Sequence, residues 1–250
     1  MTTSITIADT PLIRFTLARA DDALVLGHRL SEWIGHGPIL EEEMALGNIG
    51  LDLIGQARSL YQYVGQLAGP DEDQLAFFRD AGEYRNALLT EQPKGDFGHT
   101  MVRQLFYSAY ADPFWRRMMA STDPTLAAIA AKSEKESAYH LRHASEWVIR
   151  LGDGTAESHA RAQAAVDQLW PYTGELFEAD DPGTGIAPDP LIVRGVWAQT
   201  VGSVLARATL RTPDAGWMQS GGRHGRHSEH LGLLLAVMQS VPRAHPGATW

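Results

Sequence analysis

Glutamate and histidine side chains at helical spacing are the groups in this chain whose arrangement suggests metal chemistry. The stretch KSEKESAYHLRHASEW, residues 132–147, places Glu136, His140 and His143 on one face of a predicted helix. A di-iron carboxylate site in a helix bundle takes a Glu from each of two helices and a Glu-x-x-His pair from each of two others. At His140 this pair is broken, because position 137 is Ser.

None of the ten histidines has a Glu three residues before it. The one acidic residue in that position is Asp96, before His99, and we interpret Asp96 as a helix N-cap. We therefore predict that the chain holds no intact di-iron site. Glu136, His140 and His143 remain candidates for a smaller metal site, but we favour an ion-pair network in which Glu136 bonds His140 one turn further on.

A second histidine cluster lies near the C-terminus, where His224, His227 and His230 are three residues apart and Glu229 lies among them. Three imidazoles on one helical face could hold zinc or iron. However, His224 follows two glycines, which favours a loop at that position. A spacing of three residues also turns progressively around a helix, so the three histidines would not all stay on one face. We favour polar contacts at a helix start or contacts with a partner, with a metal site as the weaker alternative.

Apolar periodicity and helix-stop signals predict long helices and no strand. Helices are expected over residues 10–34, 40–67, 96–120, 124–152, 156–177, 191–210 and 228–241, with short helices near 75–78 and 84–89. The helix over 156–177 should bend at Pro171. We predict one all-α domain over residues 1–250, a bundle of long helices with irregular ends at residues 1–9 and 242–250.

The helix over residues 40–67 combines helix-weakening glycines with a polar stripe. The glycines are Gly47, Gly50, Gly55 and Gly65. Each costs about 1 kcal/mol relative to Ala, which a helix tolerates where a neighbour must approach closely. The stripe consists of Asn48, Asp52 and Gln56 at steps of four. Polar groups in an apolar helix need partners, so we predict a buried polar network here.

The charge composition of the chain argues against two classes of binding partner. Thirty acidic residues against twenty-one basic ones give a net charge of −9 and a pI near 5.5, which argues against nucleic acid and anionic membranes. The chain has no cysteine, which excludes disulfides and thiolate chemistry and suits a cytoplasmic location. We expect no signal peptide and no membrane-spanning helix.

Five stretches in order, spanning nearly the whole chain, resemble the structural (C-type) subunits of the multicomponent ring phenylacetyl-CoA epoxidases of aerobic phenylacetate degradation. They cover residues 29–69, 88–106, 123–155, 169–180 and 220–239. The first stretch begins with RLSEWIGHGPILEEEMALGNIG, and the last stretch is SGGRHGRHSEHLGLLLAVMQ.

This resemblance implies a ferritin-like fold and a non-catalytic role. In such complexes a catalytic A subunit of similar fold carries the di-iron centre and epoxidises the ring of phenylacetyl-CoA with O2, and a reductase with flavin and an iron–sulfur cluster supplies electrons. The C-type subunit lacks the metal ligands and pairs with the A subunit, so no cofactor is expected in this chain. Asp52, Gln56, Glu136 and His140 lie near the ligand positions of the catalytic relative, and with His143 they should form a metal-free polar network.

The leading hypothesis is therefore a structural subunit that binds the catalytic A subunit and other subunits of the complex, and that self-associates when alone. Two alternatives remain. One is an oxygenase in its own right, with a divergent metal site at Glu136, His140 and His143 or at the C-terminal histidine triplet. The other is a helical module that binds CoA thioesters.

Overall fold

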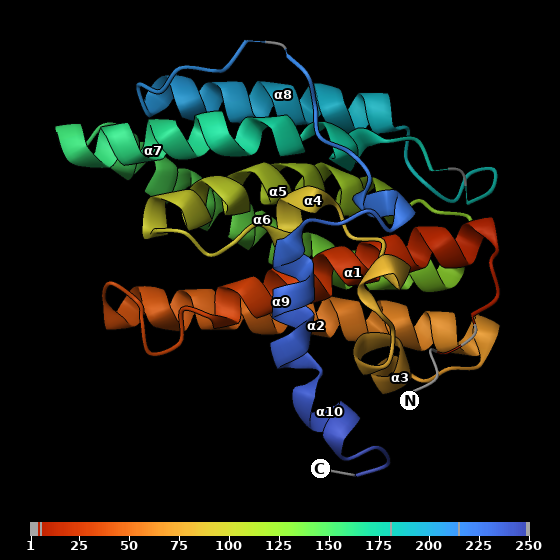
Figure 1. Cartoon of the computed structure of the whole chain (residues 1–250). Coiled ribbons are helices and arrows are strands. Elements are labelled where there is room, and N and C mark those ends of the chain that lie inside the picture. The colour runs from red at the N-terminus through yellow and green to blue at the C-terminus, as the bar shows by residue number, and fades with distance from the viewer. Residues whose placement is uncertain (1–4, 6, 181, 215, 249–250) are drawn as a thin grey trace. The chain divides into compact units, whose positions relative to one another are not determined.

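Helix starts are capped where the sequence predicts them. Thr10 Oγ1 accepts a hydrogen bond from the Ile13 amide at 3.2 Å, Asp96 Oδ1 from the His99 amide at 2.8 Å, and Asp123 Oδ1 from the Leu126 amide at 2.9 Å. Each bond satisfies an amide that has no partner inside the helix. A computed structural model describes residue 5 and residues 7–180, 182–214 and 216–248 (Figure 1).

The helices group into two compact units. The first comprises Met1–Pro93 together with Gly221–Trp250, and the second comprises Lys94–Ser220. The prediction of one domain over residues 1–250 stays a prediction. Part of the predicted irregular ends, residues 1–4, 6, 249 and 250, lies outside the described residues.

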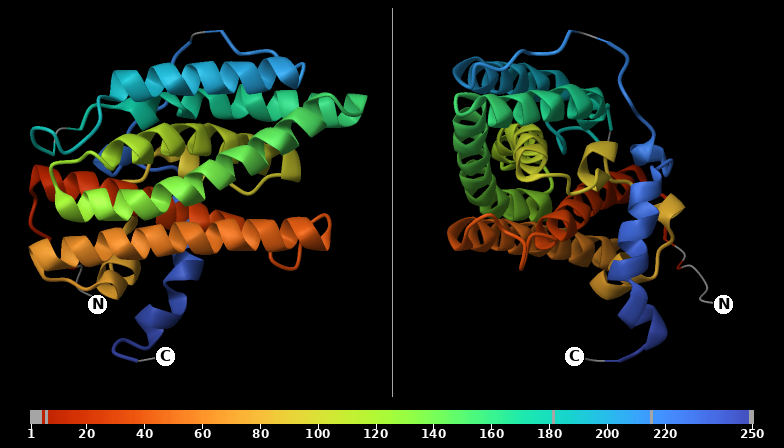
Figure 2. Two further views of the ribbon diagram at one scale, coloured as in Figure 1. Left: turned by 180° about the vertical axis from the view of Figure 1, so that it is seen from behind. Right: turned by 60° about the vertical axis from the view of Figure 1, so that its left-hand side comes forward.

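Two long helices form the body of the first unit. These are α1, Pro11–Ser31, and α2, Leu40–Ala68, which pack side by side (Figure 2). A Cβ on Gly50 would meet the Gly27 carbonyl oxygen at 3.3 Å, and one on Gly27 would meet the Gly50 carbonyl oxygen at 3.1 Å. Gly50 therefore permits the close approach that the sequence predicts, whereas a Cβ on Gly47 would meet nothing within 4 Å. Helix α1 ends at Ser31, a few residues earlier than predicted.

Short helices complete the first unit. The connector forms α3, Glu72–Phe77, the 3-10 turn η1, Ala81–Glu83, and α4, Leu88–Glu91. The C-terminal segment forms the 3-10 turn η4, Gly222–His224, and then α9, Glu229–Met238, and α10, Ser240–Ala244. The predicted last helix is thus divided at Gln239, and α10 extends into the tail that was expected to be irregular.

The second unit contains four long helices and two 3-10 turns. They are α5, Phe97–Met118, α6, Pro124–Gly152, α7, Ala156–Leu169, η2, Trp170–Tyr172, η3, Gly174–Phe177, and α8, Pro190–Arg207. The predicted bend at Pro171 is a helix end: α7 stops at Leu169 and the chain continues as 3-10 turns. Proline lacks the amide hydrogen that the next α-helical hydrogen bond would need, so the hydrogen-bond pattern of α7 does not continue through Pro171.

Aromatic side chains fill the core of the second unit. Phe106, Tyr110 and Phe114 of α5 are all buried. The Phe106 ring lies 5.7 Å from that of Trp170 in an edge-to-face arrangement. Trp197 Nε1 of α8 donates to the Phe106 carbonyl oxygen at 2.9 Å, which satisfies its polar atom in the core.

The prediction of an all-α fold is confirmed, with no strand in the part of the chain that the structure describes. Among these same residues, no helix has the length and apolar character that crossing a bilayer requires.

Candidate functional site

One face of α6 is buried and includes the position where a di-iron motif would need its carboxylate. Ser133, Ser137 and His140 are only 1%, 1% and 2% exposed. Their spacing of four and three residues keeps them on one side of the helix. Because two hydroxyls and one imidazole replace the carboxylate–imidazole pair, the donor set on this face does not fit a di-iron centre.

Glu136 and His143 lie at the margin of this face, both half-buried. Glu136 Oε1 is 3.5 Å from Lys132 Nζ one turn before it, and the His143 ring centroid is 6.2 Å from that of Tyr139. The carboxylate is thus neutralised locally by a lysine. The expected pairing of Glu136 with His140 stays a prediction.

The polar stripe of α2 is buried only in part. Gln56 is 2% exposed, Asp52 is half-buried and Asn48 is exposed. The prediction of a buried stripe is therefore wrong for Asn48, because two steps of four residues turn by about 80° around a helix. Asp52 and Gln56 belong to the first unit, whereas Glu136, His140 and His143 belong to the second. Their mutual pairing in a metal-free network stays a prediction.

In the described parts of the chain, no group of three or more His, Asp or Glu side chains is placed to hold a metal ion. A stronger argument against a di-iron site is the chemistry of the side chains, since Ser137 stands where the motif needs a carboxylate ligand. That this chain binds no metal remains a prediction, which metal analysis can test.

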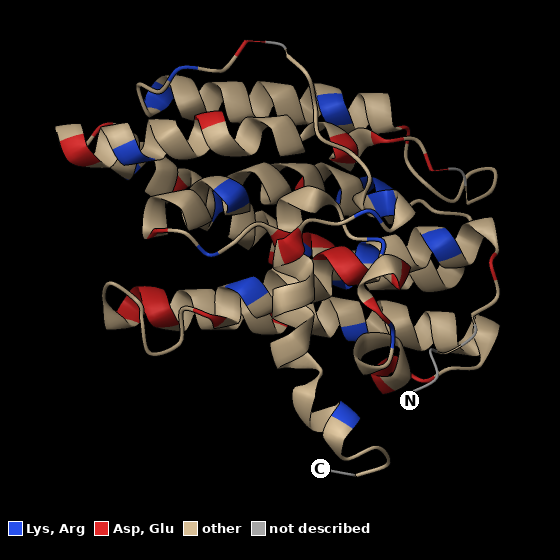
Figure 3. Ribbon diagram, viewed as in Figure 1, with Lys and Arg blue, Asp and Glu red and all other residues tan. Residues whose placement is uncertain are grey.

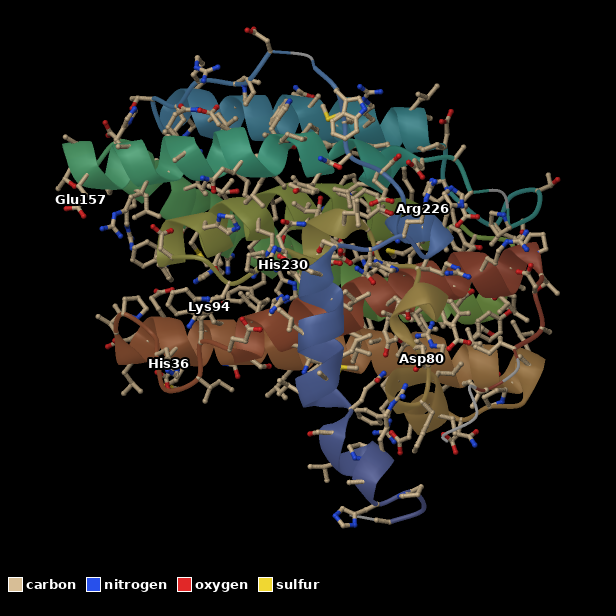
Figure 4. The ribbon with its side chains drawn as sticks, in the orientation of Figure 1. His36, Asp80, Lys94, Glu157, Arg226 and His230 are labelled. Carbon is tan, nitrogen blue, oxygen red and sulfur yellow. The ribbon has the colours of Figure 1, made fainter. Side chains whose placement is uncertain are left out.

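The C-terminal histidines lie at the start of α9. His224 is in η4 and exposed, and His227 is in the irregular segment that follows. His230 is in the first turn of α9 (Figure 4). His227 Nδ1 is 2.8 Å from Glu91 Oε2, and its Nε2 is 3.0 Å from the Tyr84 carbonyl oxygen. A metal would need a ring lone pair, whereas both nitrogens of His227 face acceptors. This geometry favours the polar-contact interpretation of the triplet.

Glu91 is the centre of this contact. Its side chain is fully buried, and besides His227 it accepts hydrogen bonds from the Ser228 amide at 2.6 Å and from Asn86 Nδ2 at 2.9 Å. Burial lowers the pKa of His227, but the hydrogen bond and charge of Glu91 outweigh burial and the net pKa is raised. The imidazolium form therefore joins α4 to the start of α9.

A second buried ion pair fixes the C-terminal segment to α1. Arg223 donates to Asp22 Oδ1 at 2.9 Å and to Oδ2 at 2.8 Å, and also to the carbonyl oxygens of Ala18 and Arg85 at 3.1 and 3.0 Å. Burial raises the pKa of Asp22, and the charge of Arg223 offsets this only in part. The Ala87 amide, at 2.7 Å from Asp22 Oδ1, adds a further bond to the carboxylate.

A third buried group joins α1, α2 and the connector. Arg79 pairs with Asp21, and Tyr61 donates its hydroxyl hydrogen to Asp21 Oδ1 at 2.5 Å. Burial lowers the pKa of Arg79, and the Asp21 charge more than reverses this. These buried charges were not among the predicted site residues. The signal was present, because Asp21 and Asp22 stand side by side in the apolar run of α1.

A cavity of about 340 Å³ lies where the starts of α5 and α7 meet the end of α6. Among its lining residues, Arg161 is 3.5 Å from Asp96 Oδ2 and 2.6 Å from Glu157 Oε1. Two carboxylates against one guanidinium make the cavity unfavourable for the phosphates of a CoA thioester. It therefore gives no support to the CoA-binding alternative.

Comparison with known proteins decides the family. Residues 1–250 match the family model described as phenylacetic acid catabolic protein. The chain belongs to the phenylacetic acid catabolic protein family. A relative in Escherichia coli (strain K12), the C subunit of 1,2-phenylacetyl-CoA epoxidase, is 47% identical over 245 residues, which cover 96% of this chain and 99% of the relative. Membership of this family, with the helical structure, confirms the predicted ferritin-like class.

Within the phenylacetic acid catabolic protein family, this chain is thus similar over nearly its full length to an epoxidase C subunit. The match includes the C-terminal segment that carries Arg223 and His227, since almost the whole of both proteins is aligned.

Proposed function

We propose that this chain is the non-catalytic structural subunit of a cytoplasmic phenylacetyl-CoA epoxidase, and that it pairs with a di-iron catalytic subunit. The observation that carries the proposal is the 47% identity to the C subunit of an epoxidase over nearly the full length of both proteins. A reductase with flavin and an iron–sulfur cluster would deliver electrons to the catalytic subunit, so the redox chemistry lies outside this chain.

The donor chemistry of α6 supports the non-catalytic part of the proposal. A buried Ser137 cannot supply the bridging carboxylate that a Glu would provide one turn before His140. The remaining polar side chains of this face can hold each other in place by hydrogen bonds. Their role would then be to keep the packing around α6 rigid without a metal, which suits a structural subunit that binds a catalytic partner.

An exposed apolar face on α2 supports the pairing. Leu40, Met44 and Leu51 are 69%, 60% and 68% exposed, and their spacing places them on one side of the helix. Ile39, immediately before α2, is 52% exposed. Contiguous exposed apolar residues of this size mark protein–protein interaction sites in soluble proteins. We assign this α2 face to the catalytic subunit.

Reconstitution tests the proposal. The chain, the catalytic subunit and the reductase are purified separately, and epoxidation of phenylacetyl-CoA is followed by mass spectrometry of the product. We expect turnover only when the chain and the catalytic subunit are both present, and unchanged turnover with Ser137→Ala. Turnover by this chain with the reductase alone would show that it is an oxygenase itself.

Binding tests the assigned face. Met44→Asp should weaken binding to the catalytic subunit, measured by biolayer interferometry, by about tenfold or more. Leu191→Asp, at a position in α8 that is 71% exposed, is the matched control and should bind normally. Equal binding by both variants would show that the interface with the catalytic subunit does not include this face of α2.

A further inference from the structure

The outward side of α6 carries a row of basic and aromatic side chains. They are all exposed and recur at steps of three or four residues, which keeps them on one side of the helix. This side, here called the basic face of α6, consists of Lys132, Lys135, Tyr139, Arg142, Glu146 and Arg150. It has four bases and one acid, although the whole chain carries a net charge of −9. Figure 3 shows basic and acidic segments interspersed along the chain, so this excess of bases departs from the general charge pattern.

Most of the positive charge on this face is not neutralised within the chain. Glu146 lies four residues from both Arg142 and Arg150, the spacing at which ion pairs form on a helix. Even so, Lys135, Arg142 and Arg150 form no ion pair with any residue that the structure describes. Three cationic groups are therefore available to a partner.

Both arginines lie over aromatic rings instead. The guanidinium carbon of Arg142 is 5.6 Å from the centroid of the Tyr139 ring, and that of Arg150 is 5.1 Å from the Trp147 ring. A cation over a ring is held by the negative potential of the ring face, and a stacked guanidinium keeps its N–H donors for an acceptor. The two arginines are thus positioned before a partner binds, which lowers the entropy cost of association.

A protein with an acidic surface is the kind of partner that this face fits. Nucleic-acid-binding proteins neutralise roughly 6–10 phosphates, more than four bases can match. The net negative charge of the chain also disfavours an extended anionic membrane. Tyrosine and arginine together are instead typical of protein interfaces, where the arginine fork binds a carboxylate with two hydrogen bonds.

The basic face of α6 differs in kind from the apolar face of α2. Apolar faces suit permanent partners, whereas charged faces suit small, transient contacts in which electrostatic attraction speeds association. In the proposed function, the electron donor is the partner that need not stay bound. We propose that the basic face of α6 binds an acidic surface of the reductase. This inference rests on the proposed function and adds to it a second partner for this chain.

Binding kinetics at two ionic strengths test the proposal. The full-length chain is immobilised and the purified reductase is bound to it by biolayer interferometry. The association rate should fall by about tenfold or more as the ionic strength rises from about 0.01 M to about 0.15 M, because the screening length shortens from about 30 Å to about 8 Å. No binding, or binding that does not respond to salt, would overturn the proposal.

Charge reversal locates the contact. Arg142→Glu and Lys135→Glu should each lower the association rate at low ionic strength by about tenfold. Arg194→Glu, at an exposed base of α8 in the same unit, changes the net charge equally and should have a far smaller effect. Equal effects of all three variants would show that only the net charge matters, and the assigned face would be wrong.

The tyrosine provides a test that does not alter charge. Tyr139→Ala removes the ring under Arg142 and should raise the dissociation rate of the reductase by about tenfold. Tyr139→Phe keeps the ring and should dissociate like the unchanged chain. An unchanged dissociation rate for Tyr139→Ala would overturn the assignment of this face as the contact.

Two further ligands keep the outcomes distinguishable. Binding of the chain to vesicles of anionic phospholipid, lost in Arg142→Glu, with no binding of the reductase, would assign the face to a membrane and overturn the proposal. Arg142→Glu should bind the catalytic subunit like the unchanged chain, and loss of that binding would place the face in the other interface. If the unchanged chain binds the catalytic subunit but not the reductase, this inference alone fails. If it binds neither, the proposed function fails as well.

Discussion

Arg223 and Asp22, 201 positions apart in the chain, form a two-pronged ion pair with hydrogen bonds of 2.9 and 2.8 Å. The Asp22 side chain is fully buried and that of Arg223 is 9% exposed. This pair and the Glu91–His227 contact hold the C-terminal segment against the helices of the first unit. The position of α9 therefore depends on buried charges, which makes the segment sensitive to substitution and to pH.

Removing the arginine should strongly destabilise the protein. Arg223→Ala leaves the Asp22 carboxylate buried without its counter-charge, and we expect a loss of about 3–5 kcal/mol in the free energy of unfolding. Arg223→Lys should cost less, because it keeps the charge but loses the two-pronged geometry. Urea denaturation followed by circular dichroism measures both.

Arg226, exposed and three residues further on, is the matched control for Arg223 (Figure 4). Arg226→Ala should change the free energy of unfolding by no more than about 0.5 kcal/mol. A loss for Arg223→Ala as small as that for Arg226→Ala would mean that the ion pair does not hold the segment.

The Glu91–His227 contact should make stability fall as the pH rises. The folded-state pKa of His227 is raised above the ordinary value of 6.5. Its stabilising contribution is therefore fully present below pH 6.5 and is lost as the pH rises through the raised pKa. A buried hydrogen bond to a charged group contributes about 1.5–3 kcal/mol. The difference in unfolding free energy between the unchanged chain and His227→Gln should be largest near pH 6 and should shrink toward about pH 9.

His36, exposed in the turn before α2, provides the control for this pH series. Because its side chain is exposed, His36→Gln should change the free energy of unfolding by no more than about 0.5 kcal/mol. A difference for His227→Gln that stays constant or grows with pH would contradict the assigned protonation state.

Two helical glycines of the second unit should respond in opposite directions to a methyl group. A Cβ on Gly152, at the end of α6, would overlap the Ala208 carbonyl oxygen and lie 2.8 Å from the Ala208 Cβ, whereas one on Gly202, inside α8, would meet nothing within 4 Å. Gly152→Ala should therefore destabilise by about 1–3 kcal/mol, and Gly202→Ala should stabilise by about 1 kcal/mol. Thermal unfolding of both variants measures this, and a change of the same sign in both would show that the α6–α8 packing differs from that described.

Local signals in the sequence predicted the long helices well. Asp123 followed by Pro124 marks the start of α6, and Gly69-Pro70 marks the end of α2, because capping and helix termination are decided by residues next to each other. The end of α7 was predicted too late, since Pro171 was read as a bend in a longer helix. Proline in a helix allows either outcome, and packing of the following turns decides between them.

The buried charges could not be paired from the sequence. Asp22 and Arg223 are adjacent only in the folded chain, and neither forms a short-range pattern with the other. Ser137, in contrast, was informative by itself, because one hydroxyl in a ligand position excludes the motif. Asn48 shows the limit of spacing arguments, since it shares a step of four with Asp52 and Gln56 but has turned out of the buried face.

The proposed function places the chemistry of the epoxidase in a partner of this chain. The most direct measurement is iron content by mass spectrometry on protein purified without a histidine tag, alone and in complex with the catalytic subunit. We predict no iron in the chain alone and about two iron atoms per heterodimer, the number in a di-iron carboxylate site. Iron near one or two equivalents in the chain alone, lost on substitution of His140 or Glu136, would contradict the account and make this chain an oxygenase.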